Sequence, residues 1–445
     1  NELAGQPEVQ GRLLGSVGQV HHALGLNEEA ETLTTRALAL QREALGPEHL
    51  EVARSLDMLG TILHDQGEYE ASEARYREAL EMRRRLAGES PDLAQSYNHL
   101  AISLQAQGDP AGAEPLYRQA LELNRRLLGA DHQETAWSLN SLAWSVHAQG
   151  RLAEAEALYR EALDQQRRTL GDVHLDVAYT LNNLGGVRFN LGDYAEAEGL
   201  WREALGLYQD LYDGDHAAVA RGMHLLGNVL RLRGRLDAAE SLARGALAMN
   251  RRLLGEDHPY VAITLWGVAS VERDRGHLAE AERLLRETLA RHEGVLRSSP
   301  RATAGSRLAL ARTLLRRGRL DEAESLARGV VELERSATDG PSVLLAGALH
   351  LLGDVLQAGG LGVAAEEALR ESTSLYRELL PEGHPDTGSA LISLGGVRLA
   401  AGDGEEAAEL LEEGLLSRRS VLPPDHPELA TIVASLEEAR GKQAD

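Results

Sequence analysis

Residues 178–211, AYTLNNLGGVRFNLGDYAEAEGLWREALGLYQDL, contain two amphipathic segments separated by a single glycine, Gly192. Before this glycine, Ala178, Leu181 and Leu184 recur every three residues, which places them on one face of a helix. After it, apolar residues recur at helical spacing: Tyr194, Ala197, Leu200, Trp201, Ala204, Leu205 and Tyr208. A glycine at this point favours the left-handed residue that ends many helices. The stretch therefore predicts a helix–turn–helix unit.

The same glycine recurs along nearly the whole chain of 445 residues. It stands at Gly25, Gly67, Gly108, Gly150, Gly192, Gly234, Gly276, Gly318, Gly360 and Gly402, with spacings of 42, 41 and then 42 seven times. One unit of this size cannot bury its own apolar face, so successive units have to stack. The register predicts an all-α protein, a right-handed α-solenoid superhelix of about ten repeats. We expect a single solenoid domain over residues 1–445, ending in a capping helix at about 427–440.

Small residues mark the places where helices are expected to cross. Seven residues before the turn glycines stand Gly18, Gly60, Ala101, Ala143, Gly185, Gly227, Ala269, Ala311, Gly353 and Gly395. Five residues after them stand Ala30, Ser72, Ala113, Ala155, Ala197, Ala239, Ala281, Ala323, Ala365 and Ala407. Only residues without bulky side chains let two helices approach closely.

The order of residues within the unit resembles a known repeat family. Small, Leu, Gly, Tyr, Ala, aromatic and Ala positions, joined by loops such as LGADH (128–132) and LGEDHP (254–259), are similar to the tetratricopeptide repeat. The form with 42 residues occurs in kinesin light chains and in many bacterial regulators. The resemblance implies a binding protein rather than an enzyme, with a peptide or helix of a protein partner held in a concave groove.

The N-terminal residues 2–10, ELAGQPEVQ, followed by Leu13 and Leu14, carry a second resemblance. They are similar to the start of the repeat region in bacterial serine/threonine kinases that carry such repeats after the kinase domain. This implies a sensory or substrate-recruiting arm of a kinase whose catalytic domain lies outside this chain. Since the chain begins with Asn1 rather than methionine, we expect a fragment or a processed form. We expect it in the cytoplasm, or outside the cell where a membrane helix precedes the array.

Composition excludes several other functions. Lys and Arg number 46 against 69 Asp and Glu, and the net charge of −23 argues against nucleic acid or an anionic membrane as a partner. No cysteine is present, which excludes disulfides and thiolate metal sites. Lys442 is the only lysine, so no kinase active site lies in the chain. No apolar run is long enough to insert in a membrane. We expect no catalytic residue, no cofactor and no bound metal.

Seven histidines and several arginine pairs recur in register. The histidines stand in the loops at His49, His132, His174, His216, His258, His384 and His426. Stacked helices place equivalent positions about 10 Å apart, too far for one zinc ion, so these histidines are predicted to be structural. The arginines end the second helices at residues 83–85, 125–126, 167–168, 251–252 and 418–419. The helix dipole and nearby glutamates favour cations there, and a phosphate or acidic-partner site is the alternative.

The family resemblance also assigns groove positions, at 13, 10, 6 and 3 residues before the turn glycine. The candidates are Asn98, Trp137, Asn140, Trp144, His147, Tyr179, Asn182, Phe189, Arg221, Asn228, Arg231, Trp266 and Arg273. Three of the four tryptophans and the single phenylalanine fall on this surface, and aromatic anchors often dominate binding energy. The asparagine amides suit a peptide backbone because each both donates and accepts, and the arginines suit acidic side chains. The alternative interpretation is that several of these residues pack between adjacent first helices.

Two classes of function fit these observations. The first is a protein-interaction scaffold that binds a partner in the groove. The second is structural self-assembly, in which the array pairs with itself or with neighbouring domains. A monomer that retains a partner favours the first class.

Overall fold

The computed structural model describes residues 6–293, 300–336 and 340–443, and helices make up most of this part of the chain. No strand occurs in these ranges, so the all-α prediction is confirmed. The chain divides into two compact units, residues 1–187 and 188–445, with the division inside one helix. The expectation of one domain over 1–445 stays a prediction. Residues 2–5 of the kinase-like N-terminal stretch lie outside the described residues.

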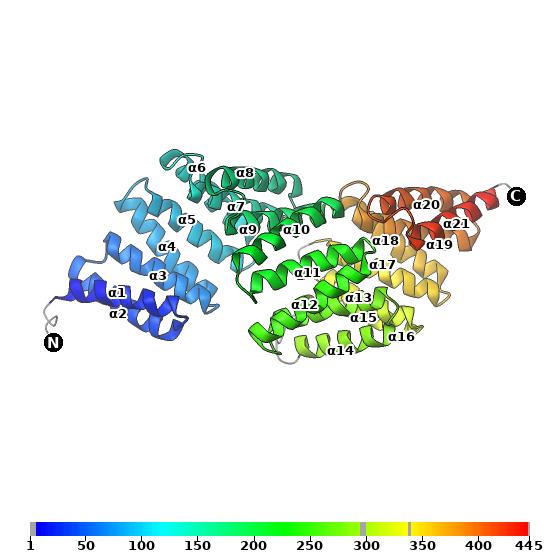
Figure 1. Cartoon of the computed structure of the whole chain (residues 1–445), viewed down its shortest axis with the longest axis horizontal. Coiled ribbons are helices and arrows are strands. Elements are labelled where there is room, and N and C mark those ends of the chain that lie inside the picture. Colours follow the sequence, from blue (N-terminus) through cyan, green and yellow to red (C-terminus); the bar gives the residue numbers. More distant parts are fainter. Residues whose placement is uncertain (1–5, 294–299, 337–339, 444–445) are drawn as a thin grey trace. The chain divides into compact units, whose positions relative to one another are not determined.

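The first unit consists of four helix pairs and most of a ninth helix (Figure 1). They are α1 (Pro7–Ala23), α2 (Asn27–Leu45), α3 (Leu50–Asp65), α4 (Tyr69–Leu86), α5 (Pro91–Ala106), α6 (Pro110–Leu127), α7 (Gln133–Ala148), α8 (Leu152–Leu170) and α9 (Leu175–Asn190).

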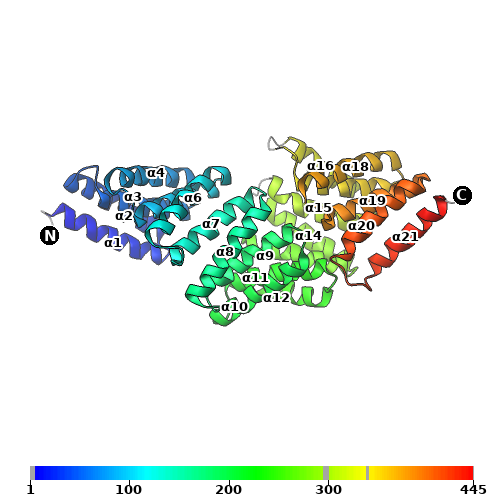
Figure 2. The same ribbon diagram turned by 90° about the horizontal axis from the view of Figure 1, so that it is seen from above.

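The second unit contains the remaining twelve helices of the described residues. They are α10 (Tyr194–Leu211), α11 (Ala217–Leu232), α12 (Leu236–Leu254), α13 (Pro259–Asp274), α14 (Leu278–Glu293), α15 (Pro300–Arg316), α16 (Leu320–Ser336), α17 (Val343–Ala358), α18 (Gly362–Leu379), α19 (Pro385–Ala401), α20 (Gly404–Arg419) and α21 (Pro427–Gln443). Figure 2 shows α19, α20 and α21 following one another at the C-terminal end.

Within each unit, a first helix packs on the second helix of its own repeat, and that second helix packs on the first helix of the next repeat. The ten small residues that follow the turn glycines by five positions are all fully buried. Glycines seven positions before the turn admit a large side chain from the second helix. A Cβ on Gly60 would lie 2.7 Å from Cε1 of Tyr76, and one on Gly353 would lie 2.5 Å from Cγ of Leu369. The expected close crossings are confirmed at these positions.

The ten turn glycines adopt φ values between 72° and 91°, the left-handed region in which a side chain is strained. The helices on both sides are short, with 16 to 19 residues in most cases, so each needs defined ends. Glycine ends the first helix, and the next helix begins two residues later.

The loop histidines have a precise local role at the start of the first helices. In each of the seven, Nδ1 accepts a hydrogen bond from the backbone N–H two residues later, at 3.1 to 3.3 Å. The imidazole therefore replaces the Ser or Asp that usually caps a helix. Because Nδ1 accepts, the neutral tautomer with its hydrogen on Nε2 is the capping form. The predicted structural role of these histidines is confirmed.

This cap gives a first prediction. His132 is exposed and its Nδ1 accepts from the backbone N–H of Glu134. We expect His132→Ala to lower the local stability at the start of α7 by about 1 kcal/mol, whereas His132→Asn, which keeps an acceptor, retains most of it. Native-state hydrogen exchange of residues 133–137 measures the difference. Equal losses in both variants would mean that the ring contributes by packing rather than by capping.

Candidate functional site

The thirteen predicted groove residues fall in two separate units. Asn98 through Asn182 belong to the first unit, and Phe189 through Arg273 belong to the second. Each group is therefore a candidate site of its own.

In the first unit, α7 presents two exposed tryptophans. Trp137 and Trp144 are 38% and 37% exposed. They stand seven residues apart with Asn140 between them, at i, i+3 and i+7, so all three share one face of the helix. Asn183 of α9 donates its side-chain N–H to Oδ1 of Asn140 at 3.3 Å, which extends this face onto the next repeat. We call Trp137, Asn140, Trp144 and Asn183 the α7 face.

Other predicted residues of the first unit lie deeper. Asn98 is 2% exposed and donates to Oγ of Ser138 at 3.4 Å, and Asn182 is 7% exposed. Two of the asparagines expected to contact a peptide backbone are thus interior, because an adjacent first helix covers this position. His147 and Tyr179 are half-buried, and burial lowers the pKa of His147.

In the second unit, Phe189 packs inside its own repeat. Its ring stacks on Tyr194 with centroids 5.1 Å apart and contacts Trp201 at 5.5 Å. Arg221 is exposed, and Asn228 accepts a hydrogen bond from Arg231 at 3.0 Å. For Phe189 the contacts match the packing interpretation.

The other three predicted residues, Arg231, Trp266 and Arg273, line a cavity of about 820 Å³ within the second unit. The first helices α11, α13, α15, α17 and α19 all contribute to its lining, and so do residues of α10, α18, α20 and α21. The cavity is therefore lined by repeats that are far apart in the sequence.

Contacts between distant loops and turns bring these repeats to one cavity. A Cβ on Gly192 would lie 2.5 Å from Cδ of Pro385 and 3.0 Å from Cδ2 of His384. A Cβ on Gly234 would lie 2.9 Å from Cδ2 of His426. Two loops before late first helices thus rest directly on two early turns of the same unit.

Cations dominate one part of the lining. The side chain of Arg231 is 11% exposed and that of Arg273 is 9% exposed, and both pair with Asp274, at 2.7 and 2.9 Å. Burial, together with the neighbouring Arg273 and Arg312, lowers the pKa of Arg231 against the opposing effect of Asp274. Burial alone would raise the pKa of Asp274, but the two arginines outweigh it and the pKa is lowered.

Two histidines near the same cavity are held neutral. Burial lowers the pKa of His350, which lines the cavity. Burial, with a smaller effect of Arg231, lowers the pKa of His224 to about 4. Neither ring therefore supplies positive charge near neutral pH, and the charge of the lining comes from arginines.

Comparison with known proteins identifies the repeat. The sequence profile of the tetratricopeptide repeat matches residues 10–85, 92–168, 176–251, 223–294 and 344–420, and a second profile of that repeat matches 58–123 and 269–341. The chain belongs to the tetratricopeptide repeat family. Tetratricopeptide repeats are generally protein-interaction scaffolds and typically non-enzymatic. No curated protein matches the sequence.

Solved structures similar to this chain have low sequence identity to it. BtubC (BKLC) from P. vanneervenii is 22% identical with a TM-score of 0.43, covering 56% of this chain and 93% of its own. A putative kinesin light chain from Podosopora anserina with nearly identical TPR-like repeats is 23% identical with a TM-score of 0.41, covering 47% of this chain and 100% of its own.

Part of the cavity lining lies at groove positions of later tetratricopeptide repeats that were not among the predicted residues. The same four groove positions in later repeats place Gly305, Leu308, Arg312, His350, Asp354, Ser389 and Ile392 in the lining. Extending the register beyond the seventh repeat would have found them. No sequence pattern predicts that early and late repeats line the same cavity.

Recurring arginines at the ends of second helices pair with acids in the loops that lead into their repeats. Arg85 pairs with Glu48 at 2.7 Å, Arg126 with Glu89 at 2.6 Å, and Arg252 with Asp215 at 2.6 Å. Each acid lies in the loop preceding the first helix of the same repeat, next to the previous second helix. These partners account for the arginines without an external phosphate or acidic ligand.

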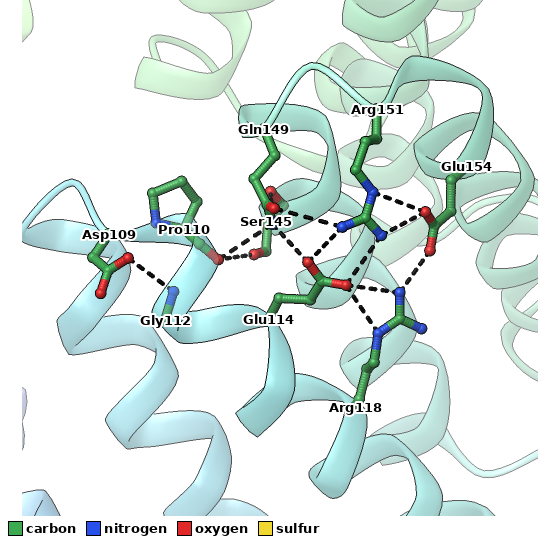
Figure 3. Close-up of polar contacts among 9 residues, drawn as sticks. All are labelled: Asp109, Pro110, Gly112, Glu114, Arg118, Ser145, Gln149, Arg151 and Glu154. Carbon is green, nitrogen blue, oxygen red and sulfur yellow. Dashed lines mark hydrogen bonds and ion pairs between the residues drawn. The ribbon is translucent and has the colours of Figure 1, made fainter. Parts of the chain in front are cut away.

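A second set of ion pairs centres on a glutamate six residues after the turn glycine. Figure 3 shows it for Glu114, which accepts from Arg118 of its own helix and from Arg151 and Gln149 of the next repeat. The Arg151 hydrogen bond contributes most to holding the pKa of Glu114 at about 2. We call this glutamate, with its arginines, the repeat carboxylate.

The described residues hold no group of three or more His, Asp or Glu side chains arranged to bind a metal ion. Among the described helices, none is both long and apolar enough to cross a membrane.

Proposed function

We propose that this tetratricopeptide array is a protein-interaction scaffold whose first unit binds a peptide segment of a partner on the α7 face. The observation that carries the proposal is the pair of exposed tryptophans on one helix face. An exposed indole buries a large apolar area when a partner covers it, and tryptophan is enriched among residues that dominate interface energy. The amides of Asn140 and Asn183 beside the indoles supply a donor and an acceptor for a peptide backbone.

The partner chemistry follows from this face. Two indoles separated by two helical turns suit a segment that carries two apolar or aromatic side chains. Asn98 and Asn182 take no part in this proposal because they are buried. The net charge of −23 disfavours a strongly acidic segment at long range.

The test selects peptides against the intact chain and then measures the affinity of the best binder by fluorescence anisotropy. We expect Trp137→Ala and Trp144→Ala each to weaken binding about tenfold or more. Tyr260→Ala, which removes a comparably exposed ring (48%) in the second unit, is the control and should leave the affinity unchanged.

Light scattering on the same variants distinguishes peptide binding from self-assembly. A chain that forms dimers in solution, with dimers lost in Trp144→Ala, would show that the α7 face meets a second copy instead of a peptide. Selected binders that keep full affinity for both tryptophan variants would also overturn the proposal.

The finer proposal is that the array is the sensory or substrate-recruiting arm of a bacterial serine/threonine kinase. Its support is the resemblance of residues 2–10 to the start of the repeat region in such kinases. In that setting the array lies in the cytoplasm, or outside the cell where a membrane helix precedes it. The coding sequence upstream of Asn1 tests it, and an upstream region without kinase motifs would overturn it.

A further inference from the structure

The cavity of the second unit contains more positive charge than its own carboxylates neutralise. Five arginines line it, and one of them, Arg418, pairs with the lining carboxylate Glu428 at 2.7 Å. The other four come from α11, α13 and α15: Arg231, Arg273, Arg312 and Arg316. We call them the arginine cluster. Asp274 is the single carboxylate paired with any of the four among the described residues.

Two members of the cluster have no carboxylate partner. Within the described part of the chain, Arg312 makes no hydrogen bond or ion pair, and Arg316 donates only to the backbone oxygen of Arg273, at 2.5 Å. Most other arginines of this acidic chain are paired with glutamate or aspartate. Like charges held together in a partly buried site destabilise the empty protein, and a bound anion relieves that cost.

Buried donors without a partner belong to residues that line the same cavity. Nε1 of Trp266, Oγ of Ser270 and Nε of Arg231 are buried and have no hydrogen-bond partner in the described residues, and all three residues line the cavity. A buried polar atom without a partner costs free energy, so three of them around one cavity indicate a polar occupant.

The size of the cavity suits a small molecule. Its volume of about 820 Å³ lies within the range of about 300–1,000 Å³ that is usual for small-molecule sites. The loops at His384 and His426 rest on the turns at Gly192 and Gly234, which brings early and late repeats of the second unit to one cavity. Besides Asp274, the lining acids are Asp354, Asp386 and Glu428, on α17, α19 and α21, and in the described residues no ion pair joins any of these three to the arginine cluster.

We propose that this cavity binds a small organic anion whose phosphate or carboxylate group is held by the arginine cluster, with Trp266 beside it. Guanidinium groups suit both oxyanions because they donate in pairs. The site is separate from the α7 face of the first unit, and neither proposal depends on the other.

The experiment uses the full chain with inorganic pyrophosphate and citrate as probes, each titrated calorimetrically at constant ionic strength. We expect at least one of them to bind and Arg312→Gln to weaken that binding roughly tenfold or more. Arg283→Gln is the matched control, since Arg283 lies on α14 of the same unit, pairs only with Glu280 and Glu287, and does not line the cavity. Binding of pyrophosphate alone assigns a phosphate ligand, and binding of citrate alone assigns a carboxylate.

Thermal melting of the empty protein gives a second readout. Arg312→Gln should melt at the same or a higher temperature than the parent chain because it removes an unpaired charge. The proposal is overturned if neither probe binds, if Arg312→Gln and Arg283→Gln bind equally well, or if an acidic peptide binds in the cavity while both small anions do not.

Discussion

Gly192→Ala is expected to lower the free energy of unfolding of the second unit by about 3 kcal/mol, of which about 1 comes from the left-handed backbone and about 2 from overpacking. At φ +81° an alanine is strained, and its Cβ would lie 2.5 Å from Cδ of Pro385. The loop that leads into α19 must then move away from the turn. We expect faster hydrogen exchange in residues 384–390 as well as a lower melting temperature.

Gly276→Ala is the matched control for this prediction. Gly276 is a turn glycine of the same unit with φ +88°, and no atom lies within 4 Å of the position of its Cβ. Its replacement should therefore cost only about 1 kcal/mol for the backbone. Equal losses in the two variants would show that the contact of the His384 loop with the turn contributes nothing to stability.

The second large effect is expected at a repeat carboxylate. The side chain of Glu198 is 4% exposed and accepts from Arg202, Arg233 and Arg235, the last at 2.6 Å. Burial alone would raise its pKa, but the three arginines outweigh burial and lower it. We expect Glu198→Ala to destabilise the second unit by about 3 kcal/mol because three guanidinium groups lose a shared partner between two repeats.

Glu324→Ala separates this inter-repeat contribution from the pair within one helix. Glu324 occupies the same register and pairs with Arg328 four residues later, but accepts from no arginine of the next repeat in the described residues. Its loss should cost about 0.5 kcal/mol. Because the pKa of Glu198 is lowered on folding, its stabilisation is present above about pH 4 and disappears as the pH falls further. Urea unfolding at pH 7 and pH 3 measures both effects, and a Glu198→Ala loss that persists unchanged at pH 3 would contradict the charge explanation.

The repeating parts of the molecule could be predicted from the sequence because each obeys one local rule. The turn glycines need a left-handed backbone, and the residues five positions later must be small to let helices cross, as the full burial of Ala155 and Ala239 illustrates. For the candidate site, the sequence could predict which repeat positions face the groove, but not which of their side chains are exposed. Asn140 and Asn98 both stand ten residues before a turn glycine, but Asn140 is half-buried whereas Asn98 is buried. This difference depends on how the neighbouring helix packs.

The cavity could not be predicted for a similar reason. Whether Arg312 meets Arg231 depends on how far each repeat turns relative to the last, which is a sum of small packing differences rather than a property of any residue. The repeat carboxylates were also missed, although a glutamate six residues after nearly every turn glycine was visible as a regular pattern.

The contacts between distant loops and turns have a consequence for how such proteins change length during evolution. His384 lies 192 residues after Gly192, and His426 lies 192 residues after Gly234, and in both contacts the ring approaches through Cδ2 and Nε2. The stacking of the second unit thus brings these two loops back onto turns that precede them by the same interval of 192 residues. Duplication of one 42-residue segment would place the next loop over Gly276, where space is free. The addition of whole repeats would therefore continue the same series of loop-to-turn contacts without displacing the two that exist.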